Sequence, residues 1–171
     1  MKIFQIIYAL SSGGAERVVL NLSNELVKDN EVYIVCIQEL EGRNNFYQNA
    51  LDEGVQLISL GNRKGNSLRA FFQVFKLIKQ YKPDVVHAHL NTLLYCFLPS
   101  LFLVKKVKYF HTLHNLAEES VGFRWQKLIN KFFYRDKIKP IAISQTCARS
   151  FREYYNFPSV YIIENSVPRA V

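Results

Sequence analysis

Seven short apolar runs, separated by stretches of helical periodicity, constrain the fold of this chain more than any other feature. The runs are bounded by turn residues and cover residues 2–8, 31–37, 55–60, 84–88, 107–111, 140–144 and 159–163. Between them, apolar residues recur at helical spacing over residues 15–26 and 68–81 and, more briefly, over 46–53 and 145–155. Such alternation is typical of parallel strands joined by right-handed helical crossovers. We therefore predict an α/β fold: a Rossmann-like, doubly wound, mostly parallel sheet of about seven strands with helices on both faces.

The length and composition are those of one domain. The chain has 171 residues, 49% of them hydrophobic, and shows neither internal repeats nor a flexible linker. The most apolar later stretch, residues 90–104, is too short to cross about 30 Å of hydrocarbon, so we predict a buried helix there. Cys36, Cys96 and Cys147 lie within strand or helix patterns and show no paired spacing. This pattern indicates buried, reduced thiols and a cytoplasmic location.

A glycine-containing turn, residues 11–17, follows the first predicted strand. Gly13 and Gly14 remove Cβ atoms where the chain reverses and where a ligand could approach the backbone. The helix that starts next offers unpaired N–H groups and the positive end of its dipole, which suit a phosphate or a sugar hydroxyl. The alternative is that the two glycines merely let a strand turn into a helix.

Polar residues also gather where later strands are predicted to end. His89 ends the fourth strand, His114 and Asn115 follow the fifth, and Ser144 ends the sixth. Ligands of parallel α/β sheets bind outside the carboxyl ends of the strands. These side chains and the glycine turn are therefore expected at one edge of the sheet, as candidate ligand contacts.

Several familiar chemistries lack their motifs. The sequence has no G-x-x-x-x-G-K-[ST] phosphate loop, no third glycine of G-x-G-x-x-G after the first strand, and no G-x-S-x-G elbow. Nucleoside triphosphate hydrolysis and a standard dinucleotide fold are therefore disfavoured. Four histidines lie near the predicted edge, but neither C-x-x-C nor H-E-x-x-H spacing accompanies them, so we expect no metal site.

The positive charge is concentrated in one segment. Residues 105–152 hold eleven cations and three anions, a surplus equal to the whole net charge of +8. Within this segment, residues 123–135 combine cations with aromatics at helical spacing, the composition of a helix that rests on an anionic membrane surface. The candidate membrane contacts are Arg124, Trp125, Lys127, Lys131 and Arg135. The alternative is that the aromatics pack on the sheet and the cations form a solvated face. Nucleic acid is not an expected partner, because no nucleic-acid-binding motif is present.

Five short motifs occur in the order found in one enzyme family. They are Gly-Gly-Ala-Glu-Arg at 13–17, Lys-Pro-Asp-Val-Val-His-Ala-His at 82–89, Thr-Leu-His-Asn at 112–115, Ile-Ser at 143–144 and Val-Tyr-Ile-Ile-Glu-Asn-Ser-Val at 160–167. With these motifs the chain resembles, from end to end, the amino-terminal domain of family four glycosyltransferases, which are retaining enzymes of GT-B architecture. One departure is Asn165-Ser166, where the family usually has Asn-Gly. The resemblance implies that residues 1–171 are a single acceptor-side domain and that a second, donor-binding domain is absent from this chain.

The resemblance also implies an activity. A sugar would pass from a nucleotide-sugar donor to a carbohydrate or lipid-linked acceptor, with retention, in the synthesis of bacterial cell-surface polysaccharide. The donor is a co-substrate, and no cofactor is implied. We expect a cytoplasmic protein, peripheral on the inner face of the cell membrane if the basic helix binds there, and an isolated domain without activity. The alternative is a stand-alone, non-catalytic α/β module that binds an anionic ligand at the glycine turn.

The resemblance assigns the first set of substrate contacts to the glycine turn. Gly13 and Gly14 would let the backbone approach the donor diphosphate and the acceptor, with Glu16 and Arg17 beside them. For the last two residues the alternative is structural: an acidic residue that complements the helix dipole and a cation that faces solvent.

The resemblance assigns the other site residues to positions at or after the ends of the later strands. His114 is the catalytic candidate: the resemblance places it near the transferred sugar, donating a hydrogen bond to a hydroxyl as a neutral imidazole. Asn115 would lie close by, and His89 and Ser144 would line the site. A histidine that caps a loop is the alternative for His114.

Overall fold

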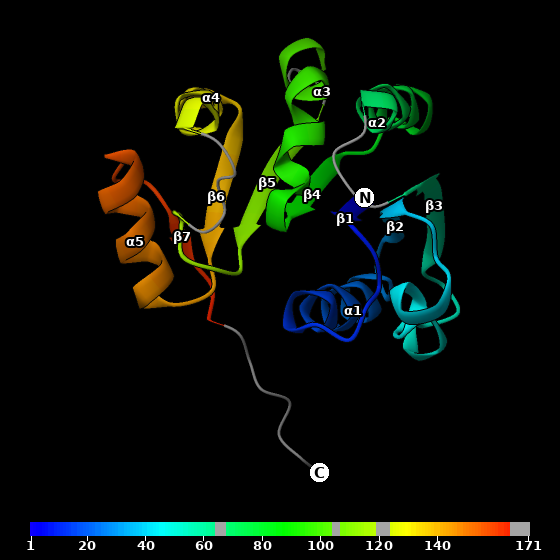
Figure 1. Cartoon of the computed structure of the whole chain (residues 1–171). Coiled ribbons are helices and arrows are strands. Elements are labelled where there is room, and N and C mark those ends of the chain that lie inside the picture. Colours follow the sequence, from blue (N-terminus) through cyan, green and yellow to red (C-terminus); the bar gives the residue numbers. More distant parts are fainter. Residues whose placement is uncertain (64–67, 104–106, 119–123, 165–171) are drawn as a thin grey trace.

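The computed structural model describes residues 1–63, 68–103, 107–118 and 124–164, and its centre is one seven-stranded, all-parallel sheet (Figure 1). The strands are β1 Lys2–Ile7, β2 Glu31–Gln38, β3 Gln56–Asn62, β4 Val85–His89, β5 Lys108–Leu113, β6 Ile138–Ala142 and β7 Tyr161–Ile162. Their order across the sheet is β3-β2-β1-β4-β5-β6-β7. The predicted α/β fold is confirmed.

Helices cover both faces of this sheet. The α-helices are α1 Gly14–Leu26, α2 Leu68–Tyr81, α3 Phe97–Phe102, α4 Arg124–Asp136 and α5 Gln145–Tyr155, and the 3₁₀ segments are η1 Gly42–Asn45, η2 Gln48–Ala50 and η3 Leu90–Cys96. Figure 1 shows α2, α3 and α4 on one side of the sheet and α1 on the other. Helix α5 packs beside α4: the Asn130 side chain donates to the Tyr155 hydroxyl at 3.0 Å, and the Tyr134 ring lies 5.0 Å from the Phe151 ring. The doubly wound arrangement follows from this placement.

The alternation of side chains along β1 divides the core into two layers. Ile3 and Ile7 belong to the cluster packed beneath α1, whereas Phe4 and Ile6 belong to the larger cluster packed beneath α2 and α4. Gln5 lies between Ile3 and Ile7 in this alternation and is completely buried. A buried polar side chain in the centre of the sheet requires a specific partner.

The strand order places a crevice at the middle of the sheet. The chain runs outward from β1 to β2 and β3, then returns to β4 on the other side of β1. At such a reversal the connections leave the two neighbouring strands in opposite directions, and ligands of doubly wound sheets bind there. The glycine turn follows β1 and η3 follows β4, so both segments border this crevice.

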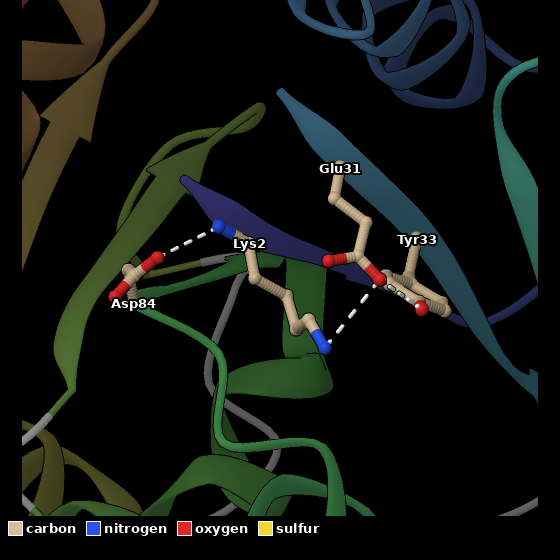
Figure 2. Close-up of polar contacts among 4 residues, drawn as sticks. All are labelled: Lys2, Glu31, Tyr33 and Asp84. Atoms are coloured by element: carbon tan, nitrogen blue, oxygen red, sulfur yellow. Dashed lines mark hydrogen bonds and ion pairs between the residues drawn. The ribbon is translucent and has the colours of Figure 1, made fainter.

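The opposite, amino edge of the sheet is held by paired charges (Figure 2). The backbone N–H of Lys2 donates to Asp84 at 2.7 Å, and the Lys2 ammonium lies 3.4 Å from Glu31. The Tyr33 hydroxyl donates to the same Glu31 carboxylate at 2.5 Å, and this bond, followed by Lys2, lowers the pKa of Glu31. These charges join β1, β2 and the start of β4, and their role is structural.

The short helix predicted over residues 46–53 is wrong. Within this range the structure has one 3₁₀ turn, η2, and the backbone is extended at Leu51. The reason is the Asn24 side chain of α1: its Oδ1 accepts from the Asp52 N–H at 2.9 Å, and its Nδ2 donates to the Ala50 carbonyl at 2.9 Å. The first of these bonds uses an N–H that an α-helix over 46–53 would give to the Gln48 carbonyl.

The single buried helix predicted over residues 90–104 is only partly present. Residues 92–96 are buried in η3, but Leu101 and Phe102 at the end of α3 are exposed. Pro99 lacks the N–H that would bond the Tyr95 carbonyl in a continuous helix, so η3 and α3 meet as two short pieces. Residues 104–106 lie outside the described part of the chain.

The three cysteines are free and buried, as predicted. Within the described ranges, none of the helices has the length and apolar character needed to cross a lipid bilayer.

Candidate functional site

A pocket of about 340 Å³ lies at the carboxyl edge of the sheet, where four strands end. It is lined by Gly14, Ala15, Glu16, Leu90, His114, Asn115 and Ile143. The lining residues come from the segments that follow β1, β4, β5 and β6. The edge predicted from the sequence therefore brings together four of its candidate residues: Gly14, Glu16, His114 and Asn115.

The backbone conformation of the glycine turn does not require glycine at positions 13 and 14. Gly13 precedes α1 with φ −91° and ψ 165°, and neither Gly13 nor Gly14 has a positive φ. A Cβ built on Gly14 would meet no other atom within 4 Å, so the described structure also leaves room for a side chain. The fold by itself does not require glycine at position 14. The missing side chain widens the pocket beside the first amides of α1.

Glu16 lies across the turn. The Ser11 hydroxyl donates to one Glu16 carboxylate oxygen at 2.7 Å, and a Cβ on Gly13 would collide with the other oxygen. Glycine at position 13 therefore makes space for the Glu16 carboxylate. The neighbouring Arg17 is exposed and is not among the lining residues of the pocket.

His114 reaches the pocket from the end of β5 and is linked to the sheet interior by two hydrogen bonds in series. Its Nε2 lies 3.1 Å from Nδ1 of His89, and Nε2 of His89 lies 2.7 Å from Oε1 of Gln5. His89 and Gln5 are completely buried. The three residues, from β5, β4 and β1, form a line from the core to the pocket.

The other two histidines lie beside this line. The His87 ring is 4.1 Å from the His89 ring, centroid to centroid, and its Nε2 lies 2.7 Å from the Thr112 hydroxyl. His111 donates from Nε2 to the Leu90 carbonyl at 2.7 Å, and its Nδ1 accepts from the Tyr134 hydroxyl at 2.7 Å. Leu90 has a φ of 56°, an uncommon conformation for a residue with a side chain, and its backbone is held there by His111.

Burial keeps these imidazoles neutral. Desolvation lowers the pKa of His87 to about 3 and the pKa values of His111 and His114 to about 4, and it lowers the pKa of His89 well below its ordinary value. At neutral pH each ring therefore carries one proton and offers one donor and one acceptor. Of the described residues, no group of three or more His, Cys, Asp and Glu side chains is arranged to hold a metal ion.

Two predicted lining residues have other positions. Ser144 is the N-cap of α5: its hydroxyl accepts from the Cys147 N–H at 3.1 Å, and it does not line the pocket. His89 stands behind His114 and borders a different pocket, of about 320 Å³, on the α1 side of the sheet. Gln5 and Leu90 carry no motif and are not among the predicted site residues. Ile143 belongs to the Ile-Ser motif but is not among the predicted site residues either, and the fold places it in the pocket lining.

The basic helix α4 divides its side chains between the core and solvent. Phe133 is buried and stacks on Phe97 at 4.3 Å between ring centroids, whereas Leu128 and Phe132 are 71% and 56% exposed. The Lys127 ammonium lies over the Tyr154 ring, 4.2 Å from its centroid. Lys131 is half-buried and Arg135 is exposed; the side chains of Arg124 and Trp125, like residues 165–166, lie outside the described structure. One exposed strip of α4 therefore carries both apolar and cationic groups.

The comparisons with known proteins agree with this fold. Residues 12–170 match the model of Glycosyltransferase Family 4, so the chain belongs to that family, as the resemblance of its motifs to the family's amino-terminal domain indicates. A relative from Campylobacter jejuni, "GalNAc-alpha-(1->4)-GalNAc-alpha-(1->3)-diNAcBac-PP-undecaprenol alpha-1,4-N-acetyl-D-galactosaminyltransferase", is 36% identical over 100 residues, which cover 54% of this chain and 26% of the relative.

Two solved structures have the same fold. Anabaena Alr3699/HepE in complex with UDP and glucose superposes with a TM-score of 0.74 at 15% identity, over 98% of this chain and 45% of that one. The lipopolysaccharide outer core galactosyltransferase WaaB superposes with a TM-score of 0.70 at 18% identity, over 98% of this chain and 46% of that one. The chain thus spans less than half the length of each of these two proteins.

Proposed function

We propose that this chain is the acceptor-side half of a retaining glycosyltransferase, which transfers a sugar from a nucleotide-sugar to a carbohydrate or lipid-linked acceptor in bacterial cell-surface polysaccharide synthesis. The observation that carries the proposal is the pocket where Gly14, Glu16, His114 and Asn115 meet at the carboxyl edge. Family membership supports the reaction class. The Campylobacter relative, whose name describes a sugar transferase for an undecaprenol-linked glycan, supports the class of acceptor.

The charges of the pocket suggest where each substrate part would lie. The backbone amides at the start of α1, beside Gly14, suit the donor diphosphate, because they combine N–H donors with a positive dipole end. The Glu16 carboxylate would repel a diphosphate and suits sugar hydroxyls, which can donate to it. His114 and Asn115 would contact hydroxyls from the other wall. Catalysis in this half would consist of positioning and of stabilising the leaving group.

The groups that hold most of the donor would lie outside this chain. The two superposed structures are more than twice its length, which supports a second domain facing the carboxyl-edge pocket. We therefore expect transfer activity from the protein produced from its full reading frame and none from residues 1–171 alone. The test is a panel of nucleotide-sugars and lipid-linked acceptors, with the configuration of the new bond determined by NMR.

We further propose that α4 holds the protein on an anionic membrane surface at the cytoplasmic side. The exposed Leu128 and Phe132 could enter the interface while Lys131 and Arg135 meet anionic headgroups. This position would bring the pocket near a lipid-linked acceptor.

A second candidate function is binding without transfer. The open amides beside Gly14 could hold an anionic ligand even if no donor domain completes the site. Donor hydrolysis or transfer by the full-length protein would exclude this alternative, whereas anion binding without turnover of any nucleotide-sugar would favour it.

A further inference from the structure

The buried amide of Gln5 stands where an apolar side chain would be more stable. It lies between Ile3 and Ile7 on the α1 side of β1 and has no exposed surface. Among the described residues its Nε2 group has no hydrogen-bond partner, and leaving a buried donor unpaired is destabilising. Within the described residues, its polar contact is the 2.7 Å bond from Oε1 to Nε2 of His89. A purely structural role does not account for this residue.

The bond between Gln5 and His89 determines where the protons lie along the line. An amide oxygen can only accept, so Nε2 of His89 must carry the proton. A neutral His89 then has a lone pair on Nδ1, which must accept from Nε2 of His114 at 3.1 Å. His114 is thereby left with a lone pair on Nδ1, for which the described structure offers no protein partner.

We propose that Gln5 is a positioning residue whose carbonyl oxygen fixes the tautomer of His89 and, through it, that of His114, so that His114 offers an unprotonated Nδ1 to a ligand hydroxyl. His114 then accepts a hydrogen bond from the substrate, in place of the donation that the family resemblance implies. The relevance for transfer rests on the function proposed above. The assignment of protons does not depend on that function: it rests on these distances and on the orientation of the Gln5 amide. With the opposite orientation Gln5 would donate to His89, and His114 would carry its proton on Nδ1.

His111 provides an internal reference for this assignment. Its Nε2 donates to the Leu90 carbonyl, a bond that requires the Nε2–H tautomer whatever Gln5 does. Long-range ¹H–¹⁵N spectra of the histidine-labelled protein at pH 7.5 distinguish the two ring nitrogens directly. We expect His89, His111 and His114 all to show the Nε2–H pattern. An Nδ1–H pattern for His114, beside an Nε2–H pattern for His111, would overturn the proposal.

Substitution of Gln5 tests the cause. Gln5→Met keeps the volume and removes the carbonyl, and we expect His114 then to exchange between both tautomers while His111 is unchanged. The matched control is Asn130→Leu, which removes another buried amide with one hydrogen bond, to the Tyr155 hydroxyl at 3.0 Å, and one unpaired atom. It should leave the His114 pattern intact. If the His114 pattern of Gln5→Met equals that of the wild type, Gln5 does not set it.

The same variants separate this inference from the proposed function. In the full-length protein, Gln5→Met should lower kcat about tenfold with a smaller change in KM, by analogy with the loss of the hydrogen-bond partner behind a metal-ligating histidine. Correct tautomers in a protein that transfers no sugar would overturn the proposed function and leave the proton assignment standing. Sugar transfer by a protein whose His114 carries its proton on Nδ1 would overturn the proton assignment and leave the proposed function standing. If Gln5→Met does not fold, the wild-type spectrum still decides the assignment.

Discussion

The Ser11 hydroxyl donates a 2.7 Å hydrogen bond to the Glu16 carboxylate, five residues along the chain, and holds it across Gly13. This contact converts a flexible acidic side chain at a helix start into a fixed wall of the carboxyl-edge pocket. A carboxylate in the first turn would also complement the helix dipole without any such bond. The bond therefore favours a role in ligand contact, which substitution can examine.

Ser11→Ala should release Glu16 and weaken substrate binding. Because the bond is only partly buried, the unfolding free energy should fall by no more than about 1 kcal/mol. The KM for the acceptor should rise severalfold, and Glu16→Gln should raise it further by removing the charge. Steady-state kinetics of the full-length protein provide the measurement. An unchanged KM in both variants would restrict Glu16 to a structural role.

Gly14→Ala and Gly14→Val should separate folding from function. Gly14 has a negative φ and open space around it, so alanine should keep or raise stability by about 0.5–1 kcal/mol, because it restricts the unfolded chain. Valine should lower transfer at least tenfold by filling the pocket. Thermal unfolding and transfer rates are compared for both. Wild-type transfer by Gly14→Val would remove the glycine turn from the site.

Gly61→Ala is the control for that pair. Gly61 has a φ of 63°, where a side chain costs roughly 1–2 kcal/mol, and it lies at the far end of the sheet in β3. It should lose stability and keep its transfer rate, the opposite of the pattern expected for Gly14→Val.

Stability should decline in mild acid because of the buried histidines. The pKa of His111 is lowered by burial to about 4, below the ordinary 6.5, so the unfolded chain takes up the proton first as pH falls. The contribution of a neutral His111 is complete above pH 6.5 and is lost as pH falls through about 4. Linkage gives about 1.4 kcal/mol per pH unit for one such group between these values.

Urea unfolding between pH 7.5 and 5 measures this slope. The wild type should lose stability steadily below pH 6.5, and His111→Gln should show a shallower slope from a lower starting stability, since it removes one of the buried groups. Identical slopes for the two proteins would mean that His111 does not stay neutral in the fold.

Binding to anionic vesicles should depend on α4. Replacing Lys127, Lys131 and Arg135 with glutamine should weaken co-sedimentation at least tenfold at low salt, because each cation near an anionic surface contributes about 1 kcal/mol. The matched control replaces Lys28, Arg43 and Lys139, which lie just after α1, in η1 and on the α1-facing side of β6, across the sheet from α4. Equal loss in both triple variants would indicate general charge attraction, and no loss in the first would support the solvated-face alternative.

The sequence predicted the architecture because the apolar periodicity of the strands and of α1, α2 and α5 is local. It failed at residues 46–53, where the Asn24 side chain bonds the backbone of Ala50 and Asp52, and at Pro99, which divides residues 90–104. Such outcomes depend on partners far away in the chain. The position of Glu16 against Gly13 likewise needs three-dimensional contacts.

The candidate site was predictable where a glycine turn or a polar residue follows a strand, as for Gly14 and His114. Gln5 could not be found in this way, because the sequence marks it only as an interruption in an apolar run. Its partner His89 is 84 residues distant, and the register of β1 with β4 brings the two together. Ser144 shows the converse: a polar residue at a strand end can serve as a helix cap.

The most direct test of the proposed function is the transfer rate of the full-length protein with His114 replaced by alanine, measured beside Asn130→Leu as a control outside the pocket. Both substitutions remove a polar side chain with little or no exposure, but of these two residues His114 alone lines the candidate site within the described structure. We predict that His114→Ala lowers kcat at least a hundredfold, on the scale of removing one group that stabilises a transition state, while folded Asn130→Leu keeps most of its activity. Equal turnover by His114→Ala and the wild type would contradict the placement of sugar transfer at this pocket.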